Sequence, residues 1–241
     1  MVEALLLHWF ESEGRDLPWR KTRDGYAILV SEVMLQQTQV ERVVPRYREW
    51  LERWPTIEAL AAAPRAEVIR RWQGLGYNRR AVNLHRAAQR IAAEGWPADL
   101  TELPGVGRYT ADAIQRFAFD APILPVDTNV RRVQKRTGAT FGPAAAHALM
   151  DLGATVCLAR IPRCGACPLS ALCPSRGRRY PPARSQGRFE GSFRQRRGRV
   201  LGLVSAGPQR LAELDAPAAA ALARDGLVEI DEGLVRLPQE R

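Results

Sequence analysis

Apolar residues recur every three or four positions through most of the first 175 residues of this 241-residue chain. The spacing is clearest in ERVVPRYREWLERW, LAAAPRAEVIRRWQ, RRAVNLHRAAQRIAAEG and RYTADAIQRFAF, and it is typical of amphipathic helices. Short stretches that contain proline or glycine, such as GLGYN and LPGVG, separate these segments. No strand-like alternation occurs before residue 198, so this part of the chain is predicted to be all-α.

The pattern changes after Cys173. Nine arginines and a single acid, Glu190, lie between Arg176 and Arg199. Residues 181–198 are therefore predicted to form a basic linker, which would add phosphate contacts beside a domain that binds nucleic acid. Residues 199–241 are predicted to form a small module in which a helix precedes a hairpin with strands LVEI and LVRL and turn DEG, as in a winged helix.

The net charge of the chain indicates the kind of partner that it binds. The net charge of +10 and the isoelectric point near 10.3 indicate a polyanion, with nucleic acid first. No apolar run approaches the roughly 20 residues of a membrane span and no signal peptide opens the chain, so a cytoplasmic protein with no membrane partner is expected. Lys21 and Lys135 are the only lysines, and neither lies in a motif that suggests a Schiff base. The three histidines, His8, His85 and His147, are isolated and are interpreted as structural or surface residues.

Every cysteine of the chain lies within one seventeen-residue stretch, CLARIPRCGACPLSALC. Clustered thiols in a cytoplasmic protein indicate a metal site rather than disulfides. The spacing C-x6-C-x2-C-x5-C favours a [4Fe–4S] cluster, because zinc ribbons usually pair two close doublets; structural zinc nevertheless stays open on spacing alone. The ligands would be Cys157, Cys164, Cys167 and Cys173.

The segment ELPGVGRYTADAI has the character of a helix–hairpin–helix. Its two glycines permit a tight turn, and the backbone amides there can point at a DNA phosphate beside the start of the next helix. Such a contact anchors the backbone of the duplex and reads no sequence. The candidate DNA-binding residues are Leu103, Gly105, Val106, Gly107 and Arg108.

This hairpin, VDTNVRRV and the cysteine cluster together resemble the endonuclease III superfamily of helix–hairpin–helix DNA glycosylases. Within this superfamily, four further segments are most similar to MutY-type adenine glycosylases: RDLPWR, SEVMLQQTQV, WQGLGYNRRAVNLHRAA and ALMDLGATVC. The resemblance implies a [4Fe–4S] cluster and a glycosylase over residues 1–180, with two helical domains flanking a DNA-binding cleft. One is a six-helix domain at about 22–117; the other is a cluster domain built from the N-terminal helix and about 118–180.

The same resemblance assigns roles to single residues. Glu32 is implied to protonate the departing adenine, which requires a dry environment that raises its pKa. Asp127 is implied to stabilise the oxocarbenium-like sugar and help water attack, with Asn129 supporting it. Gln37 matches a side chain that wedges into the stack left by a flipped base. Tyr109 stands where bifunctional relatives carry a lysine nucleophile, so weak or absent β-elimination is expected.

Three departures from the MutY pattern bear on the substrate. Asn78 stands where these enzymes usually carry a tyrosine that helps wedge beside the base opposite the target adenine. The C-terminal NUDIX-like recognition domain is missing, because residues 185–241 are too few for it. The segment between Val133 and Met150 is short, so a helix is expected to be missing.

The predicted function is that of a monofunctional, monomeric DNA repair glycosylase acting on duplex DNA with a mismatch or an oxidised base. Its expected target is adenine opposite 8-oxoguanine or guanine. Thymine opposite guanine is the alternative substrate, which Asn78 and Tyr109 favour. A catalytically weak DNA-binding paralogue and a zinc-dependent transcription factor are the alternatives from other classes.

Overall fold

The computed structural model describes residues 1–181 and 187–239 and is mostly helical. It forms two compact units, Met1–Ile28 with Gly107–Ser185 and Leu29–Val106 with Gln186–Arg241. Residues 182–186 of the predicted linker lie outside the described residues. The chain thus crosses between the units more than once, so neither unit is a continuous stretch of sequence.

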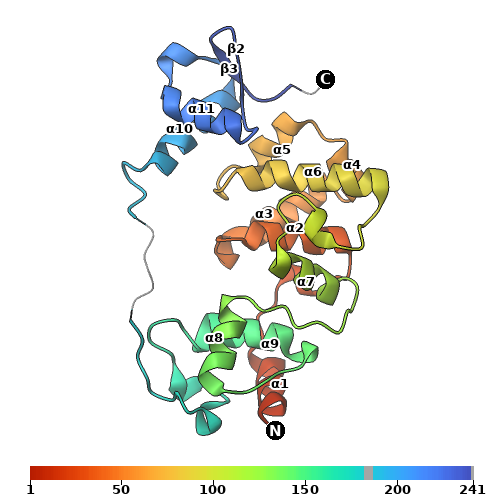
Figure 1. Ribbon diagram of the computed structural model, residues 1–241, viewed down its shortest axis with the longest axis vertical. Helices are drawn as coiled ribbons and strands as arrows, with labels where there is room; N and C mark the ends of the chain where they lie inside the picture. Colours follow the sequence, from red (N-terminus) through yellow and green to blue (C-terminus); the bar gives the residue numbers. More distant parts are fainter. Residues whose placement is uncertain (182–186, 240–241) are drawn as a thin grey trace. The chain divides into compact units, whose positions relative to one another are not determined.

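The first unit is built from short helices around one apolar core. Its helices are α1 (Val2–Glu13), the start of α2 (Gly25–Leu35), α7 (Arg108–Phe117), α8 (Thr128–Thr137) and α9 (Ala146–Asp151). Helices α1 and α8 both pack against α9 (Figure 1). The core there includes Leu6, Val130, Val133, Leu149 and Leu152, all of them at most 1% exposed. A π-helical turn, Leu152–Val156, continues α9 toward the first cysteine.

A buried carboxylate ties the N-terminal segment to α9. Asp151 is fully buried and accepts hydrogen bonds from Arg15 Nε at 2.8 Å and from Arg20 Nη2 at 2.7 Å. The Arg15 backbone amide adds a third donor at 2.9 Å. Burial alone would raise the pKa of Asp151, but the hydrogen bonds from Arg20 and Arg15 outweigh it and the pKa is lowered from 3.8.

The connection between α8 and α9 is short. Residues 138–145, all of them described, contain a left-handed cap at Gly138 and one 3-10 turn, Pro143–Ala145, and no further α-helix. The amide of Gly142 donates to Glu3 of α1 at 2.8 Å, so the short connection is held against the N-terminal helix. The connection between α8 and α9 therefore holds no additional α-helix, and the loss of a helix relative to the family stays a prediction.

The second unit contains most of α2 and the helices α3 (Val40–Arg53), α4 (Ile57–Ala61), α5 (Arg65–Trp72) and α6 (Arg79–Glu94). Helix α6 packs against α4 and α5. Trp50 lies edge-on to Trp54 and Trp72, with ring centroids 4.6 and 5.5 Å apart. Helix α2 is apolar almost all round, as expected of a helix buried on every side.

The C-terminal module belongs to this second unit. Its elements are α10 (Phe193–Ala206), β1 (Gln209–Arg210), α11 (Ala216–Arg224), β2 (Glu229–Asp231) and β3 (Leu234–Arg236), with antiparallel strand order β1-β3-β2. A helix, α11, followed by the β2–β3 hairpin lies where the sequence indicated it, and the winged-helix assignment stays a prediction. The turn of the hairpin has positive φ at Glu232 (46°) and Gly233 (77°), as a type I′ turn requires.

Helix α10 begins inside the stretch predicted to be linker. Ser192 caps it by accepting a hydrogen bond from the amide of Gln195. The buried apolar residues of this helix, Val200, Leu201 and Val204, all lie in its second half. The first two turns are rich in arginine, so the apolar period that reveals a helix starts too late to mark its beginning. The linker therefore ends at residue 192 rather than at residue 198.

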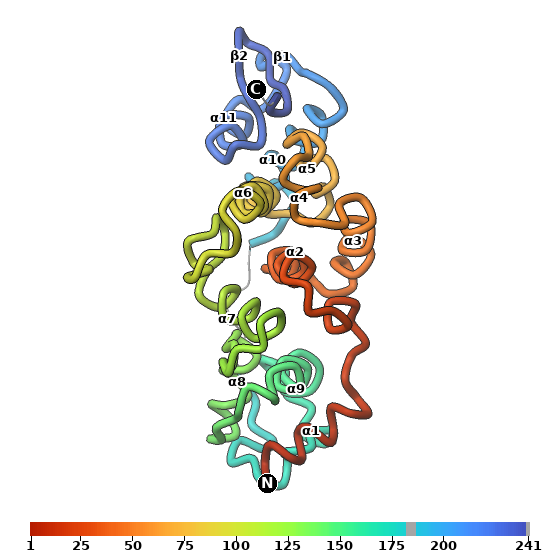
Figure 2. The backbone as a smooth tube through the Cα atoms, turned by 90° about the vertical axis from the view of Figure 1, so that its right-hand side faces the viewer, coloured from red at the N-terminus to blue at the C-terminus, as the bar shows by residue number. Residues whose placement is uncertain are grey.

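The module shares its core with the rest of the second unit. Ile69 of α5 and Val82 of α6 belong to the same buried cluster as Val200, Leu222 and Val235 of the module. Figures 1 and 2 show α10 and α11 next to α5 and α6.

In the described part of the chain, no helix is long and apolar enough to cross a membrane.

Replacing Asp151 with asparagine is expected to lower the free energy of unfolding by about 3–5 kcal/mol, because two arginines lose their buried counter-charge. Urea denaturation followed by helical circular dichroism measures this. Asp16→Asn is the control, since Asp16 pairs with Lys21 at 2.7 Å on an exposed surface. Equal urea midpoints for Asp151→Asn and Asp16→Asn would contradict the role of Asp151 as the buried counter-charge of the two arginines.

The same carboxyl predicts a pH dependence. Because the folded pKa of Asp151 lies below its unfolded value, its contribution to stability is fully present above about pH 3.9 and is lost as the pH falls through the folded pKa. The difference in stability between the wild type and Asp151→Asn should therefore shrink below about pH 3.9. A difference that stays constant into stronger acid would contradict the lowered pKa.

Candidate active site and cysteine loop

Glu32 lies in the middle of α2 and is 7% exposed. Its neighbours Val33 and Met34 are 2% and 0% exposed, and Ser31 is 1% exposed. The sequence predicted a dry environment for this carboxyl, and the structure places it in one.

Gln37 follows α2 in an exposed turn and has a positive φ of 57°. A left-handed conformation is uncommon for a residue with a side chain, so the surroundings must fix this turn. Hydrogen bonds from Arg80 of α6 supply that restraint. The turn therefore presents Gln37 to solvent on a fixed backbone.

Arg80 of α6 holds the end of α2 and the loop before α6 together. Its Nη1 donates to the carbonyls of Val33, Met34 and Gln36 at 2.8, 2.9 and 2.7 Å. Its Nη2 donates to the hydroxyl of Thr38 at 3.0 Å and to the carbonyl of Gly76 at 2.9 Å. These carbonyls include the ones that the last turn of α2 leaves without helical partners.

The guanidinium of Arg80 is buried as well as hydrogen-bonded. It lies 5.1 Å from the Trp72 ring and 5.6 Å from the Tyr77 ring, and burial lowers its pKa to about 10. Sequence reasoning missed this residue. The sequence could have indicated its burial, because Arg80 lies four and eight residues before Leu84 and Ala88 and so shares the buried face of α6 with them.

Asn78, the N-cap of α6, makes no side-chain capping bond there and is partly exposed. Within the second unit, Arg80 thus connects the turn that carries Gln37 with the loop that ends at Asn78. The structure brings these two predicted DNA-contact residues onto one restrained framework.

The hairpin before α7 has the expected apolar anchors. Leu103 and Val106 are 2% and 5% exposed, and the side-chain amide of Gln36 donates to the carbonyl of Gly105 at 3.3 Å. Gly105 has φ +80°, and a Cβ there would lie 2.8 Å from Cβ of Asn83. Gly107 has an extended backbone with open space around it, so only Gly105 is required by conformation.

Arg108 and Tyr109 open α7 in the first unit. Arg108 is 82% exposed and pairs with Asp112 at 3.1 Å, so its charge faces solvent. Tyr109 is partly exposed. Gly107 precedes them as the N-cap and offers no side chain to the first amides of the helix. The N-terminal end of a helix attracts an anion through its dipole.

Asp127 is the N-cap of α8. One carboxylate oxygen accepts the amide of Val130 at 2.6 Å, and the other accepts the side-chain amide of Asn129 at 2.8 Å. This local capping fixes the carboxylate at the start of the helix. The structure therefore brings Asp127 and Asn129 together in the way that the sequence predicted.

Arg132 extends this pair toward the cysteine loop. Its Nη2 donates to Oδ1 of Asn129 at 2.6 Å and to the carbonyl of Gly153 at 2.5 Å, and its Nε donates to the carbonyl of Cys157 at 2.7 Å. Burial is the main cause that lowers its pKa. Sequence analysis missed Arg132, because VRRV reads as surface charge and nothing in the sequence marks a carbonyl as an acceptor.

The contact between α8 and the π-helical turn leaves no room for a side chain at Gly153. A Cβ on Gly153 would lie 2.6 Å from Cβ and 3.0 Å from Cα of Asn129. The wide π-helical turn and a residue without Cβ together allow Arg132 to reach both Gly153 and Cys157. Glycine here is a packing requirement.

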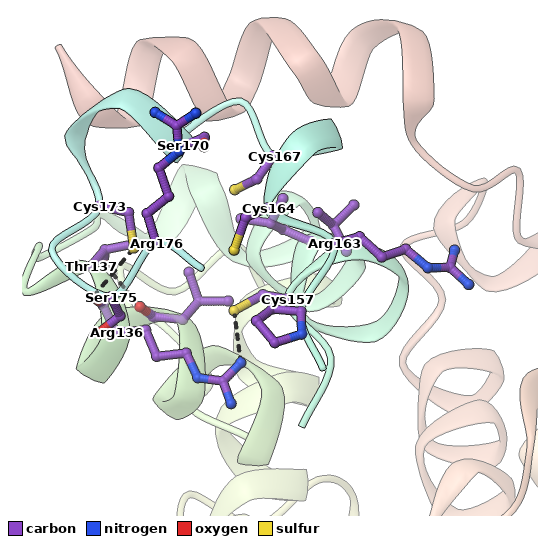
Figure 3. Close-up of a pocket in the computed structure, with 14 residues that line it drawn as sticks. Arg136, Thr137, Cys157, Arg163, Cys164, Cys167, Ser170, Cys173, Ser175 and Arg176 are labelled. Atoms are coloured by element: carbon purple, nitrogen blue, oxygen red, sulfur yellow. Dashed lines mark hydrogen bonds between the residues drawn. The ribbon is translucent and has the colours of Figure 1, made fainter. Parts of the chain in front are cut away.

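The cysteines surround one pocket, as Figure 3 shows. All are partly exposed free thiols. Burial and the charges of the three other cysteines raise the pKa of Cys167, although the amide of Leu169 opposes them. The members of the group are Cys157, Cys164, Cys167 and Cys173.

Arg136 supports the cysteine loop from α8. It is 7% exposed and donates to the carbonyls of Leu158 and Ala159 at 2.7 and 2.6 Å and to Sγ of Cys157 at 3.4 Å. Its guanidinium lies 3.7 Å from the ring centroid of Tyr180. A cation beside the sulfurs offsets the negative charge that ligating thiolates would bring.

The donor set fits a metal centre held by thiolates. Among the residues that the structure describes, no three His, Cys, Asp or Glu side chains are arranged to hold one metal ion. The four cysteines line a common pocket. Soft thiolates are also the ligands that iron–sulfur clusters use.

Gly153→Ala is expected to lower the free energy of unfolding by about 1–3 kcal/mol, because the new methyl group would push against the backbone of α8. Gly202→Ala in α10 is the control, since nothing lies within 4 Å of a Cβ there and alanine favours a helix. Urea denaturation of both proteins measures the effect. A Gly153→Ala protein as stable as Gly202→Ala would contradict the described packing.

Comparison with known proteins places these features in a family. The model of the HhH-GPD superfamily of base excision DNA repair proteins matches residues 30–152. An adenine DNA glycosylase of Mycolicibacterium smegmatis is 46% identical over 87% of this chain and 83% of its own length. One from Mycobacterium tuberculosis is 43% identical over 87% of this chain and 81% of its own length. The first alignment spans 244 positions, so that relative carries residues that this chain lacks.

Solved structures agree with the fold. A thermostable thymine-DNA glycosylase superposes with a TM-score of 0.64 at 28% identity, covering 72% of this chain and 94% of the other. Endonuclease III trapped on DNA gives a TM-score of 0.62 at 25% identity, covering 72% and 93%. From this agreement in sequence and fold, the chain belongs to the HhH-GPD superfamily of base excision DNA repair proteins and, within it, to the adenine DNA glycosylase family.

Proposed function

We propose that this protein hydrolyses the N-glycosidic bond of an adenine that is flipped out of duplex DNA, where the adenine is mispaired with 8-oxoguanine or guanine. The observation that carries the proposal is the contrast between two carboxyl groups. Glu32 is buried in an apolar helix, whereas Asp127 caps a helix and receives two N–H donors. Glycoside hydrolysis generally uses one carboxylic acid to protonate the leaving group and a second carboxylate on the opposite side of the bond.

In this proposal Glu32 is the general acid. A carboxyl group among apolar side chains favours its protonated form, which can donate a proton to the departing adenine. The carboxylate of Asp127 stabilises positive charge on the sugar and directs the attacking water. Asn129 is the positioning residue for Asp127, because its amide donates to the Oδ2 atom of that carboxylate.

Tyr109 supports a monofunctional reaction. A phenol at this position in α7 cannot form the Schiff base through which a lysine would cleave the strand. The product would therefore be an intact strand with an abasic site, which alkali cleaves. AP lyase activity should be weak or absent, and the protein is proposed to act as a monomer.

DNA would be bound through the backbone and through two inserted side chains. The hairpin from Leu103 to Arg108 and the N-terminal end of α7 suit a phosphate. Gln37 and Asn78 lie on the framework held by Arg80. Gln37 would fill the space that the flipped base leaves, and Asn78 would lie beside the base opposite it. Flipping a mismatched base costs the least unstacking energy, which favours mismatches as targets.

The cysteine loop is proposed to hold a [4Fe–4S] cluster through its four thiolates. When bound, the cluster would cross-link the loop and present a fixed surface beside DNA. Arg136 would compensate the charge of the cluster through its contact with Cys157. Arg132 would transmit the order of the loop to Asn129 and so to Asp127.

Glu32→Gln is expected to slow the single-turnover release of adenine by a factor of about 100 or more, because glutamine keeps the shape and cannot donate a proton of the needed acidity. Duplexes with A opposite 8-oxoguanine or guanine, and with T opposite guanine, would be incubated with and without alkali. Strand breaks in the A strand should occur only after alkali. Breaks without alkali would contradict the monofunctional assignment.

The matched control is Glu52→Gln, an exposed glutamate of α3. It should keep the wild-type rate, and both variants should bind the duplex with wild-type affinity by fluorescence anisotropy. A wild-type protein that releases no base from any of these duplexes, while binding them, would favour a DNA-binding paralogue.

Protein isolated without oxygen is expected to be brown and to contain iron and acid-labile sulfide in equal amounts. Cys167→Ser should lose most of the visible absorbance, because one of the proposed ligands is removed. Colourless protein with stoichiometric zinc and no sulfide would show that the cysteines hold zinc instead.

A further inference from the structure

We propose that the hydroxyl group of Ser170 donates a hydrogen bond to a sulfur atom of the cluster and thereby raises the reduction potential of the cluster. This inference rests on the proposed function, which places a [4Fe–4S] cluster among the four cysteines. Ser170 is neither a proposed ligand nor a part of the proposed catalytic machinery, so it would act on the cluster alone.

The hydroxyl of Ser170 is buried without a protein partner. Among the residues that the structure describes, none accepts or donates a hydrogen bond at its Oγ atom. A buried polar atom without a partner costs the free energy of its desolvation, so such atoms usually face a bound group, an ion or a water. The burial of this hydroxyl therefore indicates an acceptor that the surrounding chain does not supply.

Ser170 lines the same pocket as the four cysteines (Figure 3). It begins the 3-10 turn Ser170–Leu172, three residues after Cys167 and three residues before Cys173. Its amide donates to the carbonyl of Cys167 at 3.1 Å, and its carbonyl accepts the amide of Cys173 at 3.4 Å. The backbone thus connects Ser170 directly to two of the proposed ligands.

The position of Ser170 is also fixed by its other neighbour. Leu169 is 1% exposed and belongs to the apolar core of the first unit, together with Leu6 and Leu149. A serine held between a buried leucine and two hydrogen bonds has a restrained backbone. A donor that the fold already holds in place needs little reorganisation when its acceptor binds.

The pocket around Ser170 combines sulfur atoms with apolar side chains, among them Val133, Leu152 and Val156. The hydroxyl of Thr137 also lines this pocket, but it already donates to the carbonyl of Val133 at 2.9 Å. Thiolates and sulfides carry negative charge and no proton, so a hydroxyl can act toward them only as a donor.

Protein donors already reach two other sulfurs of this group. Nη1 of Arg136 donates to Sγ of Cys157 at 3.4 Å, and the amide of Gly177 donates to Sγ of Cys164 at 3.3 Å. Hydrogen bonds to sulfur are therefore a general feature of this loop, and Ser170 would extend it.

Cys173 differs from these two cysteines. Its Sγ donates to the carbonyl of Arg136 at 3.4 Å, an interaction that a ligating thiolate cannot make. Ser170 lies three residues before Cys173 and so brings an O–H donor to the end of the loop where the free thiol itself acts as a donor.

A hydrogen bond to a cluster sulfur is stronger in the reduced form, because reduction adds one negative charge. The Ser170 hydroxyl would therefore favour the reduced form and raise the potential. Water that entered beside a smaller side chain would also stabilise the more highly charged form and raise the potential. Loss of the hydroxyl and entry of water thus shift the potential in opposite directions.

Ser170→Ala tests the proposal in the full-length protein, with the midpoint potential measured by voltammetry of protein adsorbed at an electrode. At the wild-type midpoint, the ratio of reduced to oxidised cluster should fall about tenfold, as expected for one lost hydrogen bond to a charged acceptor. For a one-electron couple this lowers the midpoint by about 59 mV. Ser170→Thr keeps the hydroxyl and should keep the wild-type midpoint.

Thr137→Val is the control, because it removes a hydroxyl that lines the same pocket and is already bonded to a backbone carbonyl. Its midpoint should equal that of the wild type. Iron and acid-labile sulfide would be measured in every variant and should match the wild type. A Ser170→Ala protein that cannot be loaded with a cluster would overturn the proposal, since the hydroxyl would then serve assembly instead of the potential.

The same measurements separate this inference from the proposed cluster. Wild-type protein that holds zinc and no sulfide would overturn both. Wild-type protein with a cluster, and a midpoint in Ser170→Ala that is unchanged or higher, would overturn the role of Ser170 alone. An equal shift in Ser170→Ala and Ser170→Thr would do the same, because it would not depend on the hydroxyl. None of these outcomes requires release of adenine, since the potential is measured without DNA.

Discussion

The guanidinium of Arg132 connects the carboxylate proposed for catalysis with the loop that carries the cysteines. It donates to Asn129, Gly153 and Cys157 at 2.5–2.7 Å. This reach requires α8 to lie against the π-helical turn, which is allowed only because residue 153 has no Cβ. The geometry of Asp127 thus depends on a contact between two backbones, and a disturbance in the cysteine loop can reach the carboxylate through a single side chain.

In the second unit, a buried arginine likewise holds two segments together. Arg80 binds the end of α2 and the loop before α6 through backbone carbonyls, and those segments carry Gln37 and Asn78. A planar guanidinium with five donors in a fixed fork can satisfy several carbonyls at once, which a lysine cannot do. The arginine excess of this chain therefore has two uses: charge for the DNA backbone, and buried restraint of the loops that would contact it.

Much of this structure could be read from the sequence, because periodicity reports burial. The helices up to residue 175 and the hairpin at Glu232 and Gly233 lie where the patterns indicated. The contact between Asp127 and Asn129 was implied by the family resemblance and not by periodicity. The start of α10 could not be found, since its first turns carry arginines instead of apolar residues. The roles of Arg80, Arg132 and Arg136 were also hidden, because their acceptors are mostly backbone carbonyls, which no residue type encodes.

Competition between two substrates in one reaction tests the central claim most directly. Duplexes with A opposite 8-oxoguanine and T opposite guanine would be mixed at equal concentration, and the free bases released would be identified by mass spectrometry. The account predicts that adenine accumulates while thymine stays in its strand. Release of thymine with adenine retained would contradict it and would show that Asn78 and Tyr109 set the substrate against the rest of the family pattern.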